Sequence, residues 1–303
     1  MAEAAWVSVT STFSSERDCF VWGTFALHEA HFVLFNLFFG SCDFFGWLQR
    51  YRIQGTVYPP PELLAFTVVV VLFNHFCVQL PGLMMIWPVV EFVGGWPLVQ
   101  VSAPLPSFAT VAWQLVFSLL VEDTMFYWTH RALHHRFVYR HVHKLHHRYT
   151  TPVVIATEFA HPIEYFVANS APVLMGPLLL CGTMHCATWW FWLIIRLSEA
   201  VDGHCGYELP FSPFGVAWPL RPSGAEHDWH HSKNVGNFGS LLVLWDEICG
   251  TSRRAYLERT GKKGNSGADD GGTAVAVVAG GVHGKPRGQQ PKRRSHMREL
   301  VRF

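Results

Sequence analysis

The most unusual feature of the sequence is a histidine-rich run between residues 130 and 147. Seven of its eighteen residues are histidine, and part of the pattern returns at residues 227–231. Residues three or four apart lie on one face of a helix, so this spacing presents imidazoles together. Three clusters supply eight imidazoles: His130 and His134; His143, His146 and His147; His227, His230 and His231.

These clusters predict a metal centre. Neutral imidazole is the commonest protein ligand for zinc, copper, iron and nickel. Eight histidines exceed the needs of one ion and suit two, whereas protonated histidines packed together without metal would repel one another. His161 and His204 are isolated histidines of the same region, and either is able to complete a coordination sphere. His135, the second residue of a doublet, either binds metal or faces outward.

Carboxylates near the clusters are candidates for supporting roles. A carboxylate beside a metal-binding histidine often accepts a hydrogen bond from the other ring nitrogen. Four carboxylates suit this role or direct ligation: Asp123, Glu164, Asp202 and Asp228. Two more, Glu122 and Glu199, suit the supporting role. For each of them the alternative is a helix cap or a surface partner. The histidines outside the clusters are expected to be structural: His28, His31, His75, His141 and His185.

The rest of the chain is apolar. Half of the 303 residues are hydrophobic and 15% are charged, against about 25% in soluble domains. A helix needs about 20 apolar residues to span a bilayer. Residues 20–40, 63–87 and 107–130 meet this need, and residues 166–197 predict a hairpin of two short apolar arms broken near Cys181. We therefore expect an all-α fold, a polytopic membrane helical bundle.

The basic residues predict the orientation of this bundle. Lysine and arginine favour the cytosolic ends of membrane spans. Arg50, Arg52 and the 131–148 run are basic, whereas residues 97–106 carry no charge. The histidine clusters should therefore form a cytosolic di-metal cap. The predicted organisation is an N-terminal segment (1–19), a membrane-embedded domain (20–258) and a disordered basic tail (259–303).

Composition and missing motifs exclude several functions. A net charge of +1 indicates no nucleic-acid partner, and seven cysteines without a CxxC pair indicate no disulfide framework. The sequence has no HExxH, P-loop, GxGxxG or CxxCH motif, so a redox metal centre here would need electrons from another protein. An aromatic group either forms a wall for an apolar substrate or a belt at the membrane interface: Trp189, Trp190, Phe191 and Trp192.

The spacing H-x3-H, H-x2-H-H and H-x2-H-H resembles that of the membrane fatty acid hydroxylase and sterol desaturase superfamily. The surrounding residues resemble one branch, the C4-methylsterol oxidases, or methylsterol monooxygenases. The similarity extends over residues 20–258. It is carried by "FNHFCVQLP" (73–81), "VEDTMFYWTHRALHH" (121–135), "HKLHH" (143–147), "EFAHPIE" (158–164), "DGHCGYELP" (202–210) and "GNFGS" (236–240).

This resemblance implies a non-haem di-iron enzyme of the endoplasmic reticulum membrane. It implies dioxygen, a sterol substrate from the bilayer, and electrons from NAD(P)H through cytochrome b5 and its reductase. His204 is implied as a ligand beside the eight clustered histidines. Three positions depart from the family pattern and put the tuning of the metals in doubt: Phe126, Arg148 and Glu226.

The implied reaction is successive oxidation of a sterol C4 methyl group to the alcohol, aldehyde and acid. A separate C4-decarboxylating enzyme would then remove the acid. One alternative is a sterol C5-desaturase or another lipid hydroxylase of the same superfamily. A remote alternative, from a different functional class, is a non-catalytic membrane metal carrier.

Overall fold

The computed structural model describes residues 1–214 and 222–261, and within these ranges all the named elements are helices. The longest are α2 (Glu16–Phe45), α5 (Phe108–Leu133) and α9 (Cys186–His204). A fourth long helix is continuous through three elements: α3 (Pro61–Phe73), the π-helix η2 (Asn74–Gln79) and α4 (Leu80–Gly94). The shorter elements are α1 (Ala2–Thr10), η1 (Gln49–Tyr51), α6 (Arg136–Tyr139), η3 (His146–Arg148), η4 (Val154–Glu158), α7 (Pro162–Glu164), the π-helix η5 (Tyr165–Ser170), α8 (Ala171–Leu179), α10 (Gly224–Lys233), α11 (Leu244–Ile248) and α12 (Arg253–Thr260).

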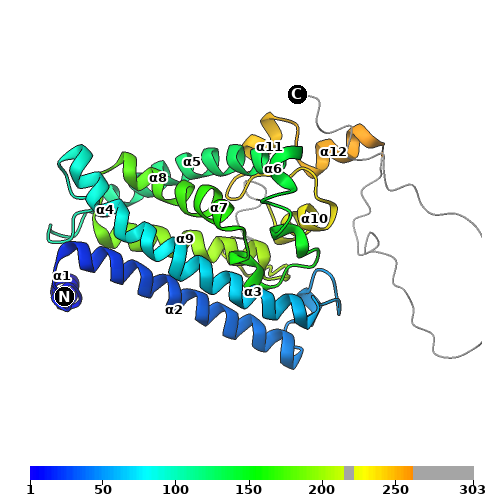
Figure 1. Cartoon of the computed structure of the whole chain (residues 1–303), viewed down its shortest axis with the longest axis horizontal. Helices are drawn as coiled ribbons and strands as arrows, with labels where there is room; N and C mark the ends of the chain where they lie inside the picture. The colour runs from blue at the N-terminus through cyan, green and yellow to red at the C-terminus, as the bar shows by residue number, and fades with distance from the viewer. Residues whose placement is uncertain (215–221, 262–303) are drawn as a thin grey trace, which may run out of the picture.

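Helix α9 lies at the centre of the bundle, where it contacts α2, α5, α8 and α10. Figure 1 shows α2, α9 and the run from α3 to α4 extending lengthwise beside one another. Large apolar side chains fill the space between them, including Phe20 of α2, Trp87 of α4 and Trp192 of α9. Burial of such side chains stabilises the bundle by about 1.5–3 kcal/mol each.

The predicted apolar stretches are helical. Residues 20–40 and 107–130 fall within α2 and α5, and residues 63–87 fall within the continuous helix Pro61–Gly94. Within the described ranges, that 34-residue helix is the one with the length and composition to cross a membrane. The predicted hairpin is present as η5 and α8 followed by α9, and its turn contains Gly182 with a φ of 78°.

Helices α5 and α8 pack closely because of a single glycine. A Cβ atom added to Gly176 of α8 would lie 2.6 Å from the Cα atom of Ser118 in α5, which is inside van der Waals contact. Only a residue without a side chain permits this approach. The contact fixes α8 against the helix whose last turn carries His130.

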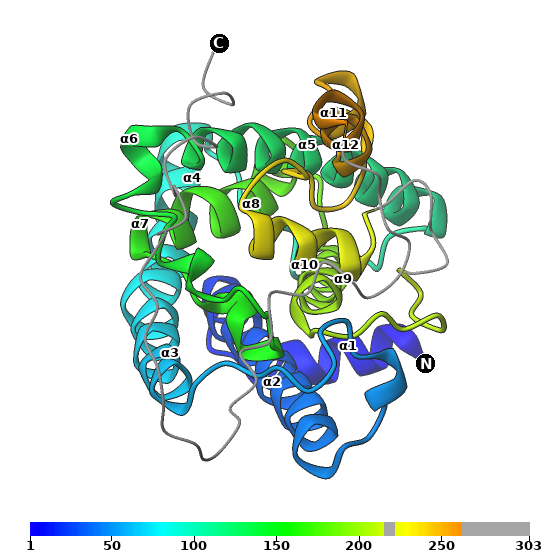
Figure 2. The same cartoon turned by 90° about the vertical axis from the view of Figure 1, so that its right-hand side faces the viewer.

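The histidine-bearing elements gather at one end of the bundle. Figure 1 shows α6, α10 and α11 near this end and α1 at the other, and Figure 2 views the bundle from the histidine end. Residues His143 to His147 form a single turn, which is closed by a 3.2 Å hydrogen bond from the His147 backbone N–H to the His143 carbonyl. At the C-terminal side, α12 ends at Thr260, and residues 262–303 of the predicted tail lie outside the described residues.

Candidate metal centre

The nine histidines singled out as metal ligands lie together in two groups. Within each group, the potential ligand atoms are all within 4.8 Å of one another. The five-histidine group is His130, His134, His143, His147 and His230; the four-histidine group is His146, His204, His227 and His231. The segment 143–147 and helix α10 each contribute to both groups. Neither segment therefore directs all its histidines to one metal group, because neighbouring histidines of each segment belong to different groups.

The ring nitrogens approach one another at metal-ligand spacing. In the five-histidine group, the Nε2 atom of His143 lies 3.0 Å from the Nε2 atoms of His134 and of His147. In the four-histidine group, the Nε2 atoms of His227 and His204 are 3.0 Å apart. Ligands about 2.1 Å from a tetrahedral ion are about 3.4 Å from one another. The measured separations of 3.0 Å are somewhat shorter than this value, and a bound ion would move the rings slightly apart.

Hydrogen bonds on the outer side fix the tautomers of these rings. A backbone carbonyl can only accept, so a ring nitrogen bonded to one must carry the proton. Five Nδ1 atoms donate in this way: His130 to Phe238 (2.9 Å), His146 to Phe159 (2.9 Å), His204 to Ala200 (2.9 Å), His230 to Gly236 (2.5 Å) and His231 to Tyr149 (2.9 Å). Each neutral ring then directs the unprotonated Nε2 lone pair into its group.

These lone pairs require a cation. The Nε2 atoms of His146 and His204 face each other at 3.4 Å, and both lack a proton in the tautomers described above. The Nε2 atom of His230 is buried and has no hydrogen-bond partner. Buried acceptors facing one another are unfavourable unless a positive charge lies between them. The donor set therefore fits metal ions bound through Nε2.

Burial keeps the histidines neutral. Removal from water, followed by repulsion from neighbouring imidazoles, holds the pKa values of His143, His147 and His231 well below their usual range. The same causes lower the pKa of His146 to about 3. Metals bind the unprotonated form of imidazole, so these residues are ready to act as ligands near neutral pH.

Of the four carboxylates predicted to support or bind the metals, Glu164 contacts a clustered histidine directly. Its Oε1 atom lies 2.7 Å from the Nδ1 atom of His143. The other three accept hydrogen bonds from groups other than the clustered histidines. Asp123 accepts from the Leu242 backbone N–H, Asp202 accepts from the Ser212 hydroxyl, and Asp228 accepts from the Gln54 amide.

His135 and His161 lie outside both groups. His135 is exposed and sits at the N-cap of α6, pointing away from its neighbour His134. The Nδ1 atom of His161 accepts a 3.2 Å hydrogen bond from the Ile163 backbone N–H and so caps α7. The structure thus gives His161 a capping role and His135 an outward position.

A cavity of about 260 Å³ ends at the metal centre. Its histidine end includes His130, His143, His146, His204 and His227. Its apolar walls come from α4, α8 and α9 and include Leu83, Ile86, Leu174, Leu178 and Leu193. A mostly apolar cavity with a few polar groups at one end is the usual form of a site for an apolar small molecule.

The four aromatic residues predicted as a substrate wall point in different directions. Trp189 lines the cavity. Phe191 is half exposed on the outside of α9, which contradicts a place in the wall. The indole of Trp190 donates to Thr24, and the indole of Trp192 donates to the Val173 carbonyl. Successive residues of a helix point about 100° apart, so four in a row cannot line one wall.

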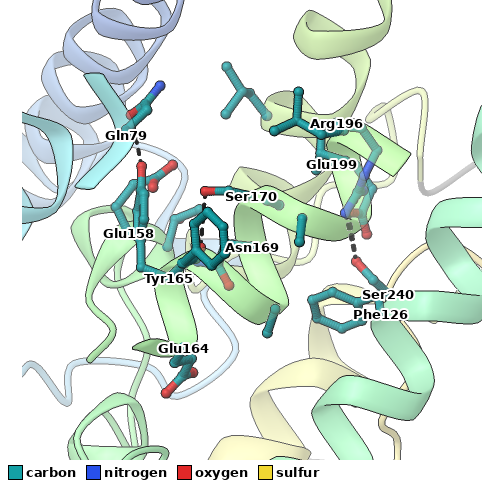
Figure 3. Close-up of a pocket in the computed structure, with 18 of the residues that line it drawn as sticks. Gln79, Phe126, Glu158, Glu164, Tyr165, Asn169, Ser170, Arg196, Glu199 and Ser240 are labelled. Atoms are coloured by element: carbon teal, nitrogen blue, oxygen red, sulfur yellow. Dashed lines mark hydrogen bonds and ion pairs between the residues drawn. The ribbon is translucent and has the colours of Figure 1, made fainter. Parts of the chain in front are cut away.

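Arg196 and Glu158, which belong to two polar clusters beside the cavity, were not singled out from the sequence, whereas Glu122 and Glu199 were. Arg196 of α9 pairs with Glu199, and its Nη2 atom lies 2.7 Å from Glu122 of α5. Figure 3 shows Arg196, Glu199 and Ser240 on one side of the cavity and Glu158 on the other. The signal for both clusters was a charged residue inside an apolar stretch, which marks a functional or paired group.

Comparisons with known proteins agree with this geometry. The fatty acid hydroxylase family model matches residues 115–251. Methylsterol monooxygenase 2-1 of Arabidopsis thaliana is 35% identical over 271 residues, which cover 84% of this chain and 95% of that protein. The chain belongs to the methylsterol monooxygenases of the fatty acid hydroxylase family. This is a non-haem di-iron oxygenase family, and the two histidine groups are this methylsterol monooxygenase's candidate di-iron centre.

Other relatives are similar to nearly the same extent. A putative methylsterol monooxygenase of Dictyostelium discoideum is 36% identical over 82% of this chain and 88% of its own. A very-long-chain aldehyde decarbonylase of Oryza sativa subsp. indica is 34% identical over 86% of this chain and 97% of its own. No solved structure matched the chain.

Proposed function

We propose that the protein is a membrane di-iron monooxygenase that oxidises the C4 methyl group of sterol precursors to the alcohol, aldehyde and acid. One observation carries the proposal. Nine neutral imidazoles form two metal-sized groups, and five of these imidazoles line an apolar cavity. The family relationship supplies the substrate class, because relatives over most of the chain are named methylsterol monooxygenases.

The proposed ligands are the nine histidines of the two groups, with one iron ion for each group. Bound iron would supply the activation of dioxygen that an unactivated methyl group requires. The chain itself orients the imidazoles through their Nδ1 hydrogen bonds and keeps them unprotonated by burial. Phe126 and Leu133 line the cavity beside His130, where they exclude water from the approaching methyl group.

The electron source and partners are part of the proposal. Electrons would come from NAD(P)H through a separate cytochrome b5 system, because the sequence has no nucleotide-binding or haem-attachment motif of its own. The acid product would pass to a C4-decarboxylating enzyme of the same pathway. We propose these two partners because the chain itself would supply only the oxidation, so electron delivery and decarboxylation would fall to other proteins.

The proposed setting is the endoplasmic reticulum membrane, in which the domain of residues 20–258 forms a polytopic bundle with its histidine cap toward the cytosol. Exposed apolar side chains along α2, α3 and α4 support burial in lipid, including Leu37, Val69 and Phe92. The basic residues at 131–148 lie beside the metal centre, and they support a cytosolic position for it.

Product analysis with the purified protein tests the function. The full chain, loaded with iron and supplied with dioxygen, NADH and a cytochrome b5 system, should convert a 4,4-dimethyl sterol to C4-hydroxymethyl and C4-carboxyl products. A new ring double bond would identify a C5-desaturase instead, and hydroxylation elsewhere another lipid hydroxylase. Conversion of a very-long-chain aldehyde alone would identify a decarbonylase, and release of metal without oxygen uptake a carrier.

A further inference from the structure

A third group of potential metal ligands lies apart from the nine histidines. It consists of His28 on α2, His75 on the π-helix η2 and Glu158 at the end of η4, and all three side chains are buried. Their potential ligand atoms lie within 4.8 Å of one another. The two histidines were expected from the sequence to be structural. No residue is shared with either histidine group, so this is a separate site.

A carboxylate lies on the outer side of both imidazoles. The Oε1 atom of Glu29 lies 3.2 Å from the Nδ1 atom of His28 and 2.9 Å from the Nδ1 atom of His75. Both rings therefore direct Nε2 inward. A carboxylate at the outer nitrogen of a histidine is the usual arrangement around protein-bound metals, where it fixes ring orientation and raises basicity.

On the inner side, both Nε2 atoms face Glu158. The His28 Nε2 atom lies 3.5 Å from Oε1, and the His75 Nε2 atom lies 3.9 Å from Oε2. Charge-assisted N–H···O hydrogen bonds are about 2.7–2.9 Å long, so both contacts are ion pairs longer than such a hydrogen bond. They are close to the separation of about 3.4 Å between two ligands of one tetrahedral ion.

His75 provides the second observation. This side chain is completely buried, and neither its Nδ1 nor its Nε2 atom has a hydrogen-bond partner. An unpaired buried polar atom costs about 1–3 kcal/mol, so it indicates an unseen partner. The π-helical turn that carries His75 is itself a conformation often found at functional sites. The adjacent Asn74 anchors this turn by donating to the Ala160 carbonyl at 2.9 Å.

We propose that His28, His75 and Glu158 bind a divalent transition-metal ion in addition to the two ions of the histidine groups. Two imidazoles and one carboxylate are a ligand set that suits zinc or ferrous iron and leaves a coordination position open. His28 and Glu158 line the cavity, so the open position faces it. Figure 3 shows Glu158 on the cavity side, beside Tyr165 and Gln79.

The site joins three segments that are far apart in the sequence. It links α2 to the π-helix η2 and to the loop that precedes Phe159, whose carbonyl holds His146 of the four-histidine group. The ion would thus fix the loop that orients one of the proposed iron ligands. This proposal concerns metal content, and it does not depend on which substrate the enzyme oxidises.

Metal analysis of the purified full chain tests the site, with Zn²⁺ as the probe. After iron loading and incubation with Zn²⁺, the wild-type chain should retain one metal ion more than the His75→Phe variant. The matched control is His31→Phe, which removes another buried histidine from α2. His31 binds Ser198 and is not a member of the group, so this variant should retain the additional ion.

Two results would overturn the proposal. Equal metal content in wild type and His75→Phe would mean that the group is an ion-pair network without metal. Zinc-edge X-ray absorption of the wild-type chain gives an answer even if His75→Phe does not fold. It should report a zinc ion bound by two imidazoles and a carboxylate, and a shell of imidazoles alone would refute the assignment.

Discussion

At the scale of single residues, hydrogen bonds at the outer Nδ1 atoms determine the tautomer and direction of the Nε2 atoms that face each metal group. Backbone carbonyls hold five of the nine grouped histidines at Nδ1, whereas a carboxylate, Glu164, holds His143. A carbonyl fixes the tautomer, and a carboxylate also increases the basicity of the ring. His143 is therefore expected to be a stronger ligand than its neighbours, and it lies 3.0 Å from both His134 and His147.

The Glu164→Gln variant tests this control. Glutamine keeps the size and an oxygen acceptor but removes the charge, so we expect metal affinity to fall about 10–100-fold. Chelator competition, followed by metal analysis, measures the change. Glu247→Gln is the control, because Glu247 is on the surface and pairs with Arg254. Equal affinity in the two variants would contradict the role given to Glu164.

The doublet His134–His135 offers a second test with adjacent residues. His134 belongs to the five-histidine group, whereas His135 is exposed and outside it. We expect His134→Ala to lose about one iron ion per chain and nearly all turnover, because a ligand of a metal site is removed. His135→Ala should keep both. Iron analysis and a product assay measure the outcome, and a similar loss in both variants would refute the assignment of ligands.

At the scale of elements, a buried ion cluster joins α5 to α9. Arg196 contacts Glu122 across the helix interface and Glu199 on its own helix, and its Nη2 atom also donates to Ser240 at 3.3 Å. Ser240 lies two residues after Phe238, whose carbonyl holds His130. The cluster thus fixes both the helix pair and the loop that orients a proposed ligand.

Arg196→Met should destabilise the protein strongly. Removing one partner leaves buried carboxylates without their countercharge, which costs about 3–5 kcal/mol of unfolding free energy. Thermal melting in detergent measures the effect, with Arg254→Met as the control. Arg254 pairs with Glu247 on the surface, and such pairs contribute about 0–1 kcal/mol. A melting point for Arg196→Met as high as that of the control would show that the cluster contributes little.

The elements also explain which features the sequence could predict. Long apolar runs determine α2, α5 and the helix from Pro61 to Gly94, because burial and helical periodicity depend on local composition. The segment from 143 to 161 has no such periodicity. Its turns are set by distant contacts, such as the hydrogen bond from His231 to the Tyr149 carbonyl. Local sequence cannot encode the position of a partner 82 residues away.

The same limit applies to the sites. Spacing along the chain identified the clustered histidines, because i,i+3 and i,i+4 neighbours share a face. It could not divide them into two groups, since each group combines residues from α5, the 143–147 turn, α9 or α10. It also could not join His28, His75 and Glu158, because His75 is 47 residues from His28 and Glu158 is 83 residues from His75. Only the packing of α2 against α4 and η4 brings these side chains together.

At the scale of the whole molecule, the two histidine groups join elements at one end of the bundle. The five-histidine group connects α5 to α10, and the four-histidine group connects α9 to α10. Helix α10 is polar apart from Trp229, so apolar burial does little to hold it. Metal that binds only the folded chain should therefore contribute directly to stability.

Removal of metal should lower the melting temperature by several degrees. An ion present at 100 times its dissociation constant stabilises the folded state by about 2.7 kcal/mol. Melting in detergent at one heating rate, before and after chelation, measures the shift, and adding Fe²⁺ should restore the original value. His135→Ala should shift as the wild type does, whereas His134→Ala should shift less because it has already lost a ligand. An unchanged melting point after complete metal removal would mean that the histidine groups form without ions, and that packing alone holds α10 in place.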